Sequence, residues 1–197
     1  EGEVWYSVFR VGLCISQQDD RPWHEAQDVF LQAWNLRPHR AEPLFHLARL
    51  HRSHGNPAAA YLFAVTAARI PFPKDDILFI TRDIYEWACL DEVASTAWYA
   101  GQKEDGLKAS IKLLEEKKFH KEHEERIVTN WRNYQHWFDE QNKMFEEAQM
   151  QARINAERED AVRQAMRQQV KEEKAKNAIK RRRQLEKKNK KRSKARR

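Results

Sequence analysis

The stretch that decides the fold is residues 26–67, AQDVFLQAWNLRPHRAEPLFHLARLHRSHGNPAAAYLFAVTA. Several of its residues recur at a spacing of 34, and the same spacing extends to a pair that precedes the stretch. The matched positions are Leu13-Cys14 and Leu47-Ala48, Ala26 and Ala60, Ala33 and Ala67, with Phe30 opposite Ala64. A period of this length is typical of a repeated unit of two helices. Small side chains at the matched positions would let helix backbones approach closely where they cross.

A third unit is predicted after an insertion of 12 residues around Pro71–Arg82. Its template positions are Val93-Ala94, Gly106, Ser110 and Leu113, of which Leu113 is the poorest match. Helical repeats need about three units for a stable stack, so the count is sufficient. The alternative is a helical bundle in which the spacing arises by chance.

The pattern resembles the tetratricopeptide repeat, a pair of antiparallel helices with a Leu-small pair in the first helix and Ala positions in the second. Pro38 stands where Pro closes such a unit. The chain departs from the family at Ala64, where an aromatic residue is common, and it lacks the Trp of the first helix. The resemblance implies an all-α, tetratricopeptide-like helical-hairpin solenoid over residues 1–138, followed by a long basic helix over residues 139–197.

Three short segments carry a narrower resemblance. They are Glu3-Val4-Trp5-Tyr6-Ser7, Arg37-Pro38-His39-Arg40-Ala41-Glu42-Pro43-Leu44, and Tyr85-Glu86-Trp87 with Leu90-Asp91-Glu92. Together they are similar to the region that follows the catalytic domain in family 2 glycosyltransferase proteins of bacteria and viruses. The resemblance implies a non-catalytic part of such a protein. That family needs an Asp-x-Asp pair for its metal-bound diphosphate, and this sequence has none. A catalytic domain would have to lie upstream of Glu1, or be absent.

Residues of catalytic or metal-binding type are few. His120-x-x-His123 lies among Glu122, Glu124 and Glu125, but a zincin needs i, i+4 spacing, so a charged helix start is the preferred interpretation. We find no phosphate-binding loop, nucleophile elbow or Cys-x-x-Cys, and we expect neither catalysis, nor a cofactor, nor a metal.

Cys14 and Cys89 are the only cysteines, which favours a reducing, intracellular and most simply cytoplasmic setting. No apolar run approaches the roughly 20 residues of a transmembrane helix.

On the tetratricopeptide template, the first helix of each unit lines the concave face. The side chains expected there are Glu42, Phe45, Arg49 and Arg52 from the second unit and Asp91, Ser95, Trp98 and Tyr99 from the third. Aromatic anchors beside arginines are typical of protein-interface hot spots. We therefore predict a protein partner on this face. The alternative is that Phe45 and Trp98 only cover the neighbouring repeat.

The C-terminal part differs in composition. All five Gly and all six Pro lie before residue 107, and from Asn142 onward the chain reads as one helix. Residues 171–197 contain 15 Lys/Arg and three acids, so their net charge is +12, whereas residues 1–170 sum to −5. The predicted polyanion-binding residues are Lys180, Arg181, Arg182, Arg183, Lys187, Lys188, Lys190, Lys191 and Arg192. Because this segment has no aromatic residue, it would contact RNA through the phosphate backbone. An anionic membrane, a nuclear-targeting signal and a merely solvated tail remain alternatives.

Two functions follow. The first is a helical-repeat scaffold or protein-interaction module without chemistry of its own, carrying a polyanion-binding tail. The second is an RNA-binding structural component of a large ribonucleoprotein particle such as a ribosome. A complete enzyme within these 197 residues is the least favoured class.

Overall fold

The computed structural model describes residues 2–76 and 78–194, with side chains as far as Arg182. Throughout these residues the chain is helical between its turns and contains no strand. The helices are α1 (Gly2–Ser16), α2 (Trp23–Leu36), α3 (Glu42–Ser53), α4 (Pro57–Ala68), η1 (Ile84–Ala88), α5 (Cys89–Ala97), α6 (Lys103–Glu116), η2 (Lys121–His123) and α7 (Glu124–Lys194). The predicted all-α class is confirmed.

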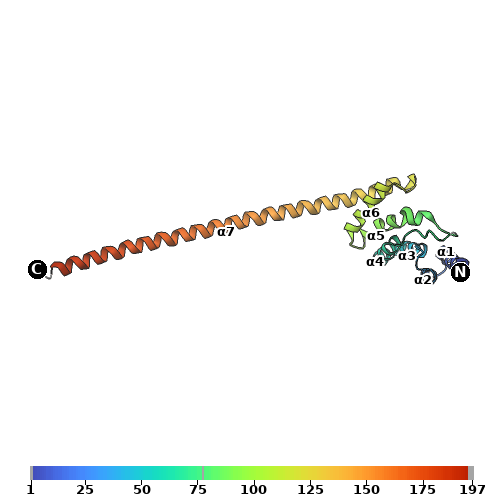
Figure 1. Ribbon diagram of the computed structural model, residues 1–197, viewed down its shortest axis with the longest axis horizontal. Coiled ribbons are helices and arrows are strands. Elements are labelled where there is room, and N and C mark those ends of the chain that lie inside the picture. Colours follow the sequence, from blue (N-terminus) through green and yellow to red (C-terminus); the bar gives the residue numbers. More distant parts are fainter. Residues whose placement is uncertain (1, 77, 195–197) are drawn as a thin grey trace. The chain divides into compact units, whose positions relative to one another are not determined.

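The chain divides into two compact units, Glu1–Glu140 and Gln141–Arg197. In the first unit α1 packs on α2, α3 on α4 and α5 on α6, and each of these hairpins contacts the next in chain order (Figure 1). As far as the structure describes the second unit, to residue 194, it consists of α7. That helix begins at Glu124, well before the start expected at Asn142, because its first turns belong to the packed core: Ile127 and Tyr134 are buried there.

The second helices of the first two hairpins pack as the repeat predicts. Ala26, Ala33, Ala60 and Ala67 are all buried to 1% exposure or less. Phe30, on the same face of α2 as Ala26 and Ala33, is fully buried as well. Close approach at these alanines holds each hairpin together.

The prediction for Cys14 is wrong, because this side chain is exposed. The close approach in α1 occurs at Gly12, where an added Cβ would lie 2.8 Å from the ring of Phe30. The connection from α1 to α2 spans residues 17–22, whereas that from α3 to α4 spans only 54–56. Because the first connection is longer, α1 is shifted relative to α2. The residue of α1 at which the two helices cross is therefore not the one that a spacing of 34 predicts.

The third hairpin buries all its predicted template positions. Ala94, Ser110 and Leu113 are between 0% and 3% exposed. At Gly106 an added Cβ would lie 2.3 Å from the ring of Tyr134, so the start of α7 packs directly against the backbone of α6. The Tyr134 hydroxyl donates to the carbonyl of Ala94 (2.6 Å), which joins α7 to α5 as well.

The insertion between α4 and η1 is attached to the second hairpin through Arg40, whose side chain is fully buried. Its guanidinium binds both carboxylate oxygens of Glu42 (3.0 and 2.7 Å). The same group donates to Asp76 (3.0 Å) and to the carbonyl of Phe79 (2.7 Å) in the insertion. The hydroxyl of Tyr85, in η1, donates to Glu42 (2.6 Å). This buried network therefore connects the second hairpin, the insertion and the third hairpin.

Candidate functional site

A cavity of about 540 Å³ lies in the first unit between α3, α5 and the start of α7. From α3 it is lined by Phe45, Arg49 and Arg52. From η1, α5 and the turn after it come Trp87, Ala88, Asp91, Glu92, Ser95 and Tyr99. The third wall is formed by His123, Arg126 and Asn130. We call this cavity the groove.

The groove brings together six of the eight residues expected on the concave face. They are Phe45, Arg49, Arg52, Asp91, Ser95 and Tyr99. Their spacing along α3 and α5 places them on the same side of each helix, as the repeat template predicts. Whether they bind a partner stays a prediction.

Glu42 is not one of the groove residues, and the expectation for it was wrong. Its side chain is fully buried and forms the ion pair with Arg40. Glu42 lies at the start of α3, where the chain turns from Arg40, so the two side chains meet inside the core. The repeat template assigns Glu42 to one face of a helix but does not predict that Arg40 lies next to it.

Trp98 faces a smaller cavity of about 90 Å³ beside the groove. Its ring packs edge-on against Tyr134 with centroids 5.3 Å apart, and the Lys103 ammonium lies 4.2 Å from its centroid. These contacts join α5, α6 and α7, so Trp98 covers the neighbouring helix, as the alternative interpretation held.

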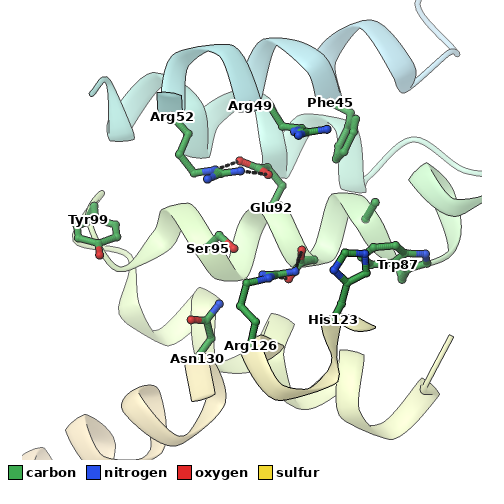
Figure 2. A pocket seen from close by; sticks show the side chains of 12 residues that line it. Phe45, Arg49, Arg52, Trp87, Glu92, Ser95, Tyr99, His123, Arg126 and Asn130 are labelled. Atoms are coloured by element: carbon green, nitrogen blue, oxygen red, sulfur yellow. Dashed lines mark hydrogen bonds and ion pairs between the residues drawn. The ribbon is translucent and has the colours of Figure 1, made fainter. Parts of the chain in front are cut away.

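Two arginine–carboxylate pairs cross the groove, and Figure 2 shows the one between Arg52 and Glu92. Arg52 donates to both oxygens of Glu92 (2.5 and 3.2 Å), and Arg126 donates to both oxygens of Asp91 (2.9 and 2.7 Å). The carboxylates are the more buried partners, since the side chains of Glu92 and Asp91 are 5% and 13% exposed. Hydrogen bonding to Glu92 raises the pKa of Arg52, and hydrogen bonding to Asp91 raises that of Arg126. The carboxylates therefore hold both guanidinium groups in one orientation, while the arginine side chains stay exposed to solvent.

Arg49 differs from these two arginines. It is exposed, and it makes no hydrogen bond or ion pair with the residues that the structure describes. Its guanidinium lies 5.7 Å from the centroid of the Phe45 ring (Figure 2). The groove therefore holds one cation whose charge no neighbouring carboxylate neutralises.

Sequence reasoning missed Glu92 and Arg126 as groove residues, together with Trp87, His123 and Asn130. Arg126 lay in the segment interpreted as a charged helix start, and the pairing with Asp91 joins residues far apart in the sequence. If the repeat template is applied a fourth time, to the start of α7, it predicts that this segment lies beside α5.

The two histidines considered as metal ligands have other partners. His120 forms a hydrogen bond with Asp83 (2.8 Å), which raises its pKa, and His123 lies against Trp87 with ring centroids 4.9 Å apart. Among residues 2–76 and 78–182, the structure contains no group of three His, Cys, Asp or Glu side chains arranged to hold a metal ion.

Three of the predicted polyanion-binding residues, Lys180, Arg181 and Arg182, are described and exposed in the second unit. The side chains of the others, Arg183, Lys187, Lys188, Lys190, Lys191 and Arg192, lie outside the described residues. Their clustering is a property of the sequence, and their binding of a polyanion stays a prediction.

Within the described part of the chain, no helix has the length and apolar character needed to cross a membrane. Comparison of the whole chain with protein families, with curated proteins and with solved structures finds no match.

Proposed function

We propose that this chain is a non-catalytic helical-repeat module that binds a segment of another protein in the groove. The observation that carries the proposal is the convergence of Phe45, Arg49, Arg52 and Tyr99 on one cavity between three helices. Aromatic residues beside arginines in a concave site are what peptide and protein partners most often use. The three short segments that resemble the region after a family 2 glycosyltransferase domain are consistent with a scaffold role next to an enzyme.

Exposure of Tyr99 adds support. Tyr99 is 75% exposed although it borders the groove, whereas Phe45 and Trp87, at the opposite end of the groove in Figure 2, are each 8% exposed. A large aromatic group that stands free at the edge of a cavity gains much buried area when a partner covers it. The buried rings of Phe45 and Trp87 form an apolar part of the groove wall.

Selection from a random 15-residue peptide library on the full chain tests this proposal. We expect selected peptides to lose at least about tenfold in affinity for the Ser95→Trp variant, because an indole at this position fills the groove. Ser7→Trp, at an exposed site of α1 away from the groove, is the matched control and should bind normally. Far-ultraviolet circular dichroism checks that both variants keep their helix content. Peptides that bind the wild type and Ser95→Trp equally would contradict the proposal.

A second candidate function is polyanion binding by the second unit, as in a structural component of a ribonucleoprotein particle. It is favoured by the net charge of +12 over residues 171–197 and by the exposure of the described cations Lys180, Arg181 and Arg182. The absence of aromatic residues in this segment points to phosphate contacts rather than base stacking.

Its test is fluorescence anisotropy with a 20-nucleotide single-stranded RNA over a salt series. In the variant K180Q/R181Q/R182Q/R183Q we expect weaker binding and a log–log salt slope smaller by about 3, since each lost phosphate contact removes about 0.7. The matched control removes four exposed cations of the first unit and should leave the slope unchanged: R10Q/K108Q/K112Q/R132Q. Equal slopes in the two variants would reduce the basic segment to a solvated helix.

A further inference from the structure

We propose that the partner segment in the groove is acidic, and that one of its carboxylates binds Arg49. This inference rests on the proposed function, because it names the chemistry of the partner that the groove takes. It follows from the balance of hydrogen-bond donors and acceptors on the walls of the groove.

The donors outnumber the acceptors. A guanidinium has five N–H groups, and Arg52 and Arg126 each use two of them toward a carboxylate, so three remain on each. Arg49 keeps all of its N–H groups, since it has no polar partner among the described residues. A ligand that satisfies these donors must be rich in acceptor atoms, and a carboxylate is acceptor-only.

The acidic residues of the groove are already neutralised. Glu92 and Asp91 are mostly buried behind the arginines that they pair with, so they present little negative charge to a ligand. The three arginines and two acids together leave one positive charge in the groove, and it is carried by Arg49. Charge complementarity therefore favours an anionic partner.

The remaining surface fits a peptide better than a nucleic acid. Phe45 and Trp87 are more than nine-tenths buried, so Tyr99 is the one groove aromatic whose ring is exposed, whereas single-stranded nucleic acid is bound by several rings on which successive bases stack. Ser95 and Asn130 are half-buried and make no hydrogen bond with described residues, and both can bond a peptide backbone. The geometry points to a short segment with an acidic residue next to an apolar one.

The test measures binding of a fluorescein-labelled 12-residue peptide of alternating Glu and Leu to the full chain by anisotropy. The neutral comparison peptide has Gln in place of every Glu, and a 12-nucleotide oligouridine provides the nucleic-acid comparison. We expect the Glu peptide to bind the wild type at least about tenfold more tightly than the Gln peptide. The Arg49→Glu variant should lose at least about tenfold in affinity for the Glu peptide, because a like charge replaces the cation.

Arg10→Glu is the matched control, because Arg10 is an exposed arginine of the same unit outside the groove, and it should stay within about twofold of the wild type. The basic segment is the same in both variants, so its own attraction for the peptide cancels in the comparison. Equal losses in Arg49→Glu and Arg10→Glu would overturn the inference, as would an oligouridine affinity that depends on Arg49 more than the Glu-peptide affinity does.

The library selection separates this inference from the proposed function. Groove-dependent peptides without excess Asp or Glu would overturn the acidic partner while leaving the interaction module standing. The absence of any groove-dependent peptide would overturn both.

Discussion

Replacement of Arg40 by leucine should lower the free energy of unfolding of the first unit by about 3–5 kcal/mol. The substitution leaves the Glu42 carboxylate fully buried without its cation, and it removes the donors that hold Asp76 and the carbonyl of Phe79. Urea unfolding followed by tryptophan fluorescence measures the change. All seven Trp lie at or before residue 137, so this signal reports on the first unit alone.

Two further variants make the Arg40 prediction specific. Arg10→Leu removes an exposed arginine and should change stability by no more than about 0.5 kcal/mol. The double variant R40L/E42L should recover part of the loss, because no uncompensated charge remains at Glu42. A midpoint for Arg40→Leu equal to that of Arg10→Leu would show that the buried pair does not hold the insertion in place.

Acid should destabilise the first unit through His46. Burial lowers the pKa of His46 to about 4, and the nearby Arg49 charge acts in the same direction. In the unfolded chain the pKa of a histidine is about 6.5, so the unfolded state binds the proton more readily. The neutral imidazole therefore contributes full stability above pH 6.5, and about 3 kcal/mol of it is lost as the pH falls from 6.5 to 4.

The surroundings of His46 explain why it is kept neutral. Its ring lies among Phe9, Phe30 and Phe45, with centroids between 5.2 and 5.7 Å away, and these rings offer no anion to balance an imidazolium charge. His51 acts in the same sense, because burial lowers its pKa and neither ring nitrogen has a hydrogen-bond partner among the described residues.

Urea midpoints measured from pH 7.5 down to pH 5 test the acid prediction. The wild type should lose about 2 kcal/mol between pH 6.5 and 5, and His46→Leu should have a flatter profile over the same range. His24→Leu, at an exposed histidine of α2, is the control and should keep the wild-type slope. A His46→Leu profile as steep as that of the wild type would assign the acid sensitivity to other groups.

Prediction from the sequence worked best where a residue type has one packing role. The alanines at 26, 33, 60 and 67 repeat at a fixed spacing because two helices cross closely there, and all four are buried. It failed at Cys14, because the length of the connection before α2 moves the crossing point to Gly12. The residue at which two helices cross depends on the length of the connection between them, and the spacing of a repeat does not give that length.

The candidate site, too, was predicted from the sequence only in part. The positions of Phe45, Arg49, Arg52, Asp91 and Tyr99 were predicted from the resemblance to the tetratricopeptide repeat, and the groove contains them all. The same template placed Glu42 on that face, but its ion pair with Arg40, two residues earlier in the chain, lies in the core. A helical pattern gives the side on which a residue lies and does not give the neighbour that it meets there.

By itself, the sequence determined the helical class, the stacked hairpins and the separation of a basic segment from a mildly acidic first part, because these depend on local periodicity and composition. Only the tertiary structure decided that the start of α7 closes the groove, that Arg126 pairs with Asp91 and that no carboxylate of the described residues pairs with Arg49. Those features arise from contacts between residues distant in the chain, whose pairing depends on how the hairpins stack and is not encoded in any one segment.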